Sequence, residues 1–120
     1  MAGAGFIAHE GREIYYINIA GAGAEEIKRI SEAAKADIRK QPQGSVLTIT
    51  NVSDVNMIPE ISNTLKDLAA SNKPYVKAGA VLGVTGLKKI TFNAVLMFSG
   101  RRNLHLFDTM EEARDWLVKQ

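Results

Sequence analysis

Strand-like and helix-like segments alternate along almost the whole chain, and this alternation constrains the fold more than any other feature. After an opening pair of strand-like runs, apolar residues at helical spacing alternate with short β-rich runs in the order β-β-α-β-α-β-α-β-α. Strands that alternate with helices are typical of a largely parallel sheet covered by its connecting helices. We therefore expect an α/β fold with a mixed, mostly parallel sheet, in one domain over residues 1–120.

The expected elements follow from apolar periodicity and from turn residues. Glycine at the second position of the Glu10-Gly11 turn indicates a hairpin, and this gives one antiparallel pairing. Thr109 and Glu112 have the spacing of a capping box, which marks the start of the last helix. Strands are expected at 5–9, 12–20, 45–50, 75–84 and 104–107, and helices at 24–40, 59–70, 87–99 and from 110.

Composition excludes several chemistries. The chain has no cysteine, so disulfides, thiolate catalysis and cysteine–zinc sites are absent. The two histidines, His9 and His105, have no ligand spacing and no accompanying serine–acid grouping, so we expect structural or surface histidines, no metal and no enzyme. The 15 basic and 13 acidic residues are interleaved, which argues against a nucleic-acid partner.

Membrane insertion and secretion are not expected either. No apolar run approaches the ~20 residues that span a bilayer, and residues 1–5 lack the charged and apolar regions of a signal peptide. We expect a cytoplasmic protein.

The turn Gly21-Ala22-Gly23 lies between a strand and a helix and resembles the first half of a dinucleotide fingerprint. Glu26 replaces the third glycine, and its charge opposes a pyrophosphate at the helix N-terminus. A plain βα turn without a cofactor is the better interpretation.

The helix expected at 87–99 is apolar on nearly all sides. Helical spacing puts Phe92 and Leu96 opposite the expected core stripe, with Val95 between them. The expected core stripe consists of Leu87, Ile90, Ala94, Met97 and Phe98. Such a helix is either deeply buried or meets a second apolar surface, which could be a partner subunit, a mobile loop or an apolar ligand.

The start of the same helix carries groups that favour an anion. Thr85, Lys88 and Lys89 combine free amides with ammonium groups. Solvated lysines remain the favoured interpretation.

The loop 51–56 follows the central strand at the end where open α/β sheets bind ligands. Ser53 could accept a phosphate there. Simple turn and capping roles for Ser53, Asp54 and Asn56 are the favoured alternative.

Two stretches of the chain carry a family resemblance. Residues 80–96 join a strand, a glycine-containing turn and an apolar helix, and residues 106–117 place Phe-Asp before a helix with acidic, Ala and Trp-Leu positions. Together they resemble the C-terminal half of SpoIIAA-like (STAS-like) small domains. The resemblance implies a STAS-like fold, no enzymatic activity, and a role in regulation or protein interaction.

The resemblance also implies a phosphorylation site, from which this chain departs. Anti-sigma factor antagonists of the family carry a phosphorylated serine in an Asp-Ser-Ser-Gly-like motif before the second helix. The corresponding loop here begins Ser53-Asp54-Val55-Asn56 and lacks the motif, so Ser53 is the remaining candidate.

Three functions stay open at this point. The leading hypothesis is a non-catalytic binding module that meets a protein partner, or a second copy in a homodimer, through the helix at 87–99. The second is a carrier that holds a small apolar or anionic ligand beneath that helix, near Gly79, Gly83 and Lys88. The third is a phosphoregulated antagonist that uses Ser53.

Overall fold

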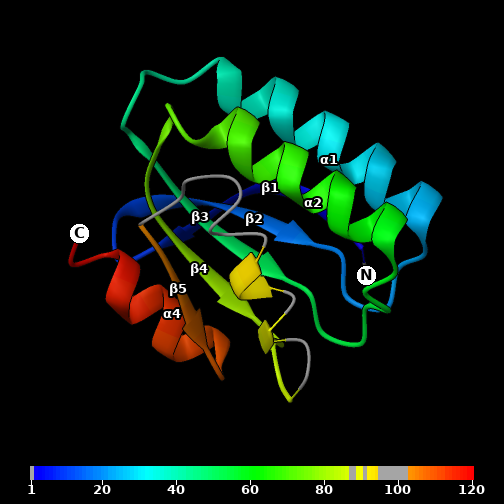
Figure 1. Ribbon diagram of the computed structural model, residues 1–120. Helices are drawn as coiled ribbons and strands as arrows, with labels where there is room; N and C mark the ends of the chain where they lie inside the picture. Colours follow the sequence, from blue (N-terminus) through cyan, green and yellow to red (C-terminus); the bar gives the residue numbers. More distant parts are fainter. Residues whose placement is uncertain (1, 87–88, 91, 95–102) are drawn as a thin grey trace.

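The computed structural model describes residues 2–86, 89–90, 92–94 and 103–120, and these form an α/β structure (Figure 1). Residues 89–90 and 92–94 are helical, and the rest of the helix expected at 87–99 lies outside the described residues. The elements are β1 (Gly3–His9), β2 (Arg12–Asn18), α1 (Ala24–Arg39), β3 (Val46–Asn51), α2 (Pro59–Asn72), β4 (Val76–Leu82), β5 (Leu104–Phe107) and α4 (Met110–Leu117). The expected α/β class is confirmed.

The five strands form one mixed sheet in the order β1-β2-β3-β4-β5. β1 runs antiparallel to β2, and the pairings β2–β3, β3–β4 and β4–β5 are parallel. The strand order therefore advances in one direction from β2 to β5. Because crossovers between parallel strands are right-handed, this order directs every connection from β2 to β5 over the same face of the sheet.

The hairpin prediction is confirmed. His9 pairs with Arg12, so the turn has two central residues, Glu10 and Gly11. Both have positive φ, 49° and 78°, as a turn that matches the right-handed twist of the strands requires.

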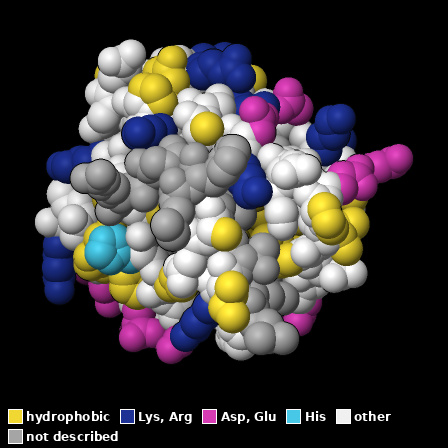
Figure 2. Space-filling model, in the orientation of Figure 1, with side chains coloured by type: hydrophobic (Ala, Val, Ile, Leu, Met, Phe, Trp, Pro, Cys, Tyr) yellow, Lys and Arg dark blue, Asp and Glu magenta, His cyan; other side chains and the backbone are white. Residues whose placement is uncertain are grey.

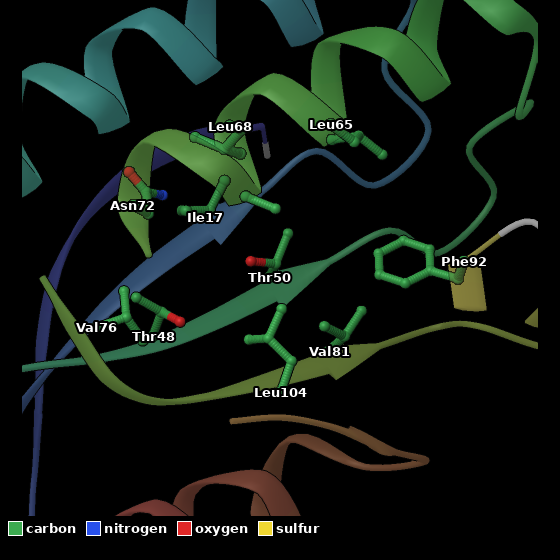
Figure 3. Close-up of a pocket in the computed structure, with 11 residues that line it drawn as sticks. Ile17, Thr48, Thr50, Leu65, Leu68, Asn72, Val76, Val81, Phe92 and Leu104 are labelled. Atoms are coloured by element: carbon green, nitrogen blue, oxygen red, sulfur yellow. The ribbon is translucent and has the colours of Figure 1, made fainter. Parts of the chain in front are cut away.

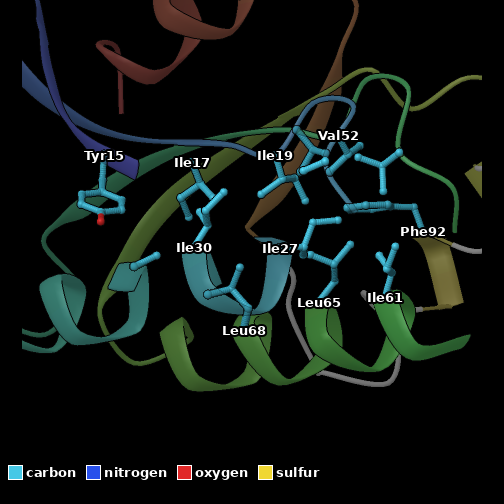
Figure 4. Close-up of a cluster of buried hydrophobic side chains, with 14 of the residues drawn as sticks. Tyr15, Ile17, Ile19, Ile27, Ile30, Val52, Ile61, Leu65, Leu68 and Phe92 are labelled. Atoms are coloured by element: carbon cyan, nitrogen blue, oxygen red, sulfur yellow. The ribbon is translucent and has the colours of Figure 1, made fainter. Parts of the chain in front are cut away.

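Helices cover both faces of the sheet. α1 and α2 lie side by side on one face (Figure 1), and their apolar stripes meet Tyr15 and Ile17 of β2 (Figure 4). On the opposite face Ala113 and Leu117 of α4 pack against a second cluster, which includes Ile14. Ile14 and Tyr15 are adjacent and both fully buried, so β2 is covered on both sides as expected.

Polar contacts fix α1 against the sheet and against α2. The Tyr15 hydroxyl donates to Asp37 of α1 over 2.7 Å, and Lys35 of α1 donates to Asp67 of α2 over 2.5 Å and also pairs with Glu32. The hydrogen bonds to Asp67 and Glu32 raise the pKa of Lys35, so it stays charged although it is buried. These contacts link α1 to β2 and α2 to α1.

Charges of both signs are spread over the surface. On the face shown in Figure 2, basic and acidic side chains both occur around the rim, with hydrophobic side chains scattered between them. Among the described residues, no helix is long and apolar enough to cross a membrane.

The Tyr15–Asp37 contact gives a pH-dependent prediction. Burial, and then the hydrogen bond to Asp37, raise the pKa of Tyr15 above its ordinary value of about 10. A folded-state pKa that is raised stabilises the protein fully below pH ~10, and this stabilisation is lost as the pH rises further and the unfolded chain ionises. Tyr15→Phe should lower the free energy of unfolding by ~1–2 kcal/mol at neutral pH. Urea unfolding should show this difference shrinking above pH ~10, and a difference that stays constant would contradict the account.

Candidate functional site

A cavity of about 40 Å³ lies between α2 and the sheet (Figure 3). Among the residues that the structure describes, its walls come from β2, β3, α2, β4 and β5 and from Phe92 in the segment that follows β4. These described lining residues are neutral, and most are apolar. They are Ile17, Thr48, Thr50, Leu65, Leu68, Ala69, Asn72, Val76, Val81, Phe92 and Leu104.

The periodicity of each element explains which side chains reach the cavity. Leu65, Leu68 and Asn72 of α2 are three and four residues apart, so they share one helix face. Thr48 and Thr50 of β3 are two residues apart, so both point to the same side of the sheet. β3 therefore places two hydroxyl groups opposite the apolar stripe of α2.

Gly79 of β4 has no side chain, and this allows Leu104 and Thr48 to approach each other on the sheet side of the cavity. A Cβ atom at this position would lie 2.3 Å from Leu104 Cδ2 and 2.7 Å from Thr48 Oγ1. The missing side chain therefore lets Leu104 of β5 lean across β4 toward Thr48. The carrier hypothesis expects a ligand near Gly79, and in the structure a side chain of the neighbouring strand, Leu104, approaches this glycine.

Phe92 closes one end of the cavity, and here the sequence-based expectation is wrong. Phe92 was expected on the outer side of its helix and Ile90 in the core, but Phe92 is 5% exposed and Ile90 is 70% exposed. Two residues apart on a helix, their side chains must point to nearly opposite sides. When a helix is apolar on nearly all sides, periodicity fixes these relative directions but not which side faces the sheet.

The other residues predicted around this helix are not brought to the cavity. Thr85 and Lys89 are exposed and do not line it. Leu96, Val95 and Lys88 lie outside the described residues. The anion-binding group expected at the helix start therefore stays a prediction.

Ser53 has a structural role in the loop after β3. Its hydroxyl donates to Asn51 Oδ1 over 2.7 Å, and its amide donates to the same oxygen over 3.0 Å. Its carbonyl accepts from Gly21 N over 2.9 Å, which joins the βα turn at Gly21 to this loop. Gly83, with φ 86°, packs so closely that a Cβ there would lie 2.2 Å from Ser53 Oγ. This matches the favoured turn interpretation, and phosphorylation of Ser53 stays a prediction.

The fold brings His9 to two carboxylates, which the sequence did not indicate. His9 Nε2 lies 3.2 Å from Asp115 Oδ1 and 3.9 Å from Glu10 Oε2. These residue types can hold a metal ion, although both carboxylates are largely exposed and the His9–Asp115 hydrogen bond already joins the β1–β2 hairpin to α4. His105 stacks on Trp116 with ring centroids 4.6 Å apart and remains a surface residue.

Asn72, the last residue of α2, is not among the site residues predicted from the sequence. It is 4% exposed and takes the next position of the apolar stripe after Ile61, Leu65 and Leu68. A polar residue in that position is the signal that could have identified it.

Comparisons of the chain with protein-family models, with curated proteins and with solved structures give no match.

The reversed orientation of the segment around Phe92 predicts unequal effects of two substitutions. Phe92→Ala removes a buried ring from the core and should lower the free energy of unfolding by about 3 kcal/mol. Ile90→Ala, the matched control on the exposed side, should change it by less than ~0.5 kcal/mol. Chemical denaturation of both variants measures the pair, and equal effects would show that the orientation described here is wrong.

Proposed function

We propose that the protein is a non-catalytic binding module whose site is the cavity between α2 and the sheet, and that it holds a small, mainly apolar molecule. The observation that carries this proposal is a cavity with an apolar lining and a few polar groups, closed by the buried ring of Phe92. Small-molecule sites in proteins are usually concave and apolar, with a few polar groups that orient the ligand.

The size of the cavity defines what binding requires. About 40 Å³ is room for a few water molecules, whereas a cavity that takes up benzene is on the order of 150 Å³. A ligand of ring size must therefore displace a lining side chain. Phe92 is the candidate, because it comes from a connecting segment, whereas the other lining residues belong to strands or to α2. In this proposal its ring leaves the core when the ligand enters.

The family resemblance supports the non-catalytic part of the proposal. Residues 80–96, which resemble STAS-like domains, include the end of β4 and Phe92. STAS-like domains generally act in regulation, and some bind nucleotides or lipids. A STAS-like regulatory module that responds to a small ligand combines the first two sequence-based hypotheses.

Toluene, a neutral apolar probe, tests this function. Wild-type protein should bind toluene in saturation-transfer NMR. Val81→Leu adds a methylene group to the wall of the small cavity and should weaken binding several-fold. Val118→Leu, the same change on a half-buried residue just after α4, should leave binding unchanged. Failure of the wild type to bind toluene, or equal binding by the two variants, would remove the cavity as the site.

A second candidate is interaction with a protein partner or a second copy through the exposed side of the segment around Phe92. Its supporting observation is Ile90, a large apolar side chain that is 70% exposed. Size-exclusion chromatography with light scattering tests self-association: a dimeric wild type and a monomeric Ile90→Glu would support it. A monomeric wild type would rule out the homodimer.

A further inference from the structure

The polar residues of the cavity are gathered at one end. In Figure 3, Asn72 and Thr48 lie at the end near Val76, whereas Phe92 closes the other end. The hydroxyl group of Thr50 lies between α2 and the sheet, whereas that of Thr48 is directed toward β4, where a Cβ atom at Gly79 would lie 2.7 Å from it. A molecule that fills the cavity therefore meets hydrogen-bonding groups at one end and apolar side chains at the other.

Asn72 has an unmet hydrogen-bonding group at this polar end. Its Oδ1 atom is buried and accepts no hydrogen bond from the described part of the chain. The backbone carbonyl of Asn72 accepts from Tyr75 N over 2.9 Å, a contact that any residue at this position would keep. Leaving a buried acceptor without a donor costs free energy. In Figure 3 the amide nitrogen of Asn72 faces the other lining residues, and a turn of the carboxamide would present Oδ1 to a donor in the cavity.

The charge of the lining restricts the ligand further. None of the lining residues that the structure describes carries a charge, so among these residues an ionised ligand would find no counter-ion, at a large cost in free energy. Of the apolar or anionic ligand expected from the sequence, the described lining favours the uncharged one. A carboxamide and two hydroxyl groups can both donate and accept, which suits a neutral hydroxyl or amide group.

We propose that the ligand of this cavity is a small neutral molecule with an apolar body and one hydroxyl or amide group, and that Asn72 is the residue that selects it. This inference rests on the proposed function, because it concerns the same cavity. It makes Asn72 a specificity-determining residue, with Thr48 and Thr50 as its polar neighbours. The hydroxyl or amide of the ligand donates to Asn72 Oδ1, while its apolar body takes the place of the Phe92 ring.

Three aromatic probes of similar shape test the inference: phenol carries a hydroxyl group, toluene carries none, and benzoate is charged. Dissociation constants are measured by NMR titration for the wild type, for Asn72→Leu and for Asn63→Leu, a control at an exposed position of the same helix. Wild type and Asn63→Leu should bind phenol about fivefold to tenfold more tightly than toluene, as one added hydrogen bond allows. Asn72→Leu should lose this preference and still bind toluene, and benzoate should bind none of the three proteins.

The unfolding temperature is a second readout. It distinguishes a ligand-selecting Asn72 from an Asn72 that only supports the fold. Without ligand, Asn72→Leu should unfold at a higher temperature than the wild type, because an unmet acceptor is replaced by an apolar side chain of similar size. A lower unfolding temperature would mean that Asn72 supports the fold and would overturn the inference. Equal binding of phenol and toluene by the wild type would overturn it as well. If neither probe binds, the proposed function itself fails.

Discussion

The right-handed crossover between parallel strands is the constraint on which the rest of this structure depends. Because the strand order advances in one direction from β2 to β5, every connection between these strands must pass over one face of the sheet. α1 and α2 occupy that face, and the buried side chain of Phe92 shows that the connection from β4 to β5 reaches it too. Of the helices that the structure describes, only α4, which follows the last strand, covers the opposite face, where it packs on Ile14 and its neighbours.

The cavity follows from this arrangement. The Tyr15–Asp37 contact joins α1 to β2, and the Lys35–Asp67 contact joins α2 to α1, so the two helices stay side by side on this face. The space between α2, β4 and β5 is left to side chains from other elements. Phe92 fills this space from one end. The side chain of Leu104 enters it from β5, over Gly79, where no side chain blocks it. Between them remains a neutral, mainly apolar space with the carboxamide of Asn72 at one end. Our proposals ascribe ligand binding to this space.

Most of the fold could be predicted because it depends on local signals. The Glu10-Gly11 turn has the expected two-residue form, and Thr109 Oγ1 accepts from Glu112 N over 3.1 Å, as its capping-box spacing indicated. The orientation of the segment around Phe92 could not be predicted in this way. The sequence pattern puts apolar residues on nearly all sides of the expected helix, so the pattern alone does not tell which side faces the sheet.

The candidate site depends on contacts between residues that are distant in the sequence, which explains why much of it was missed. In the sequence, Asn72 resembles an ordinary polar residue at the end of a helix. Only the packing of α2 against the sheet shows that Asn72 and Thr48 line the same cavity. His9 and Asp115 are likewise brought together only by the packing of α4 near the hairpin. One of the three sequence-based hypotheses places a ligand beneath the helix expected at 87–99 and near Gly79. The cavity is lined by Phe92 and by Thr48 and Leu104, which lie against Gly79, and ligand binding there stays a prediction.

Methyl-detected NMR of the wild-type chain, titrated with phenol, tests the central claim most directly because it locates the bound molecule. The account predicts shifts confined to methyl groups around the cavity, led by Leu65, Leu68 and Val81, with Ile14 and Ile49 beneath α4 unchanged. Shifts centred on the α4 face, or no shifts at all, would contradict it.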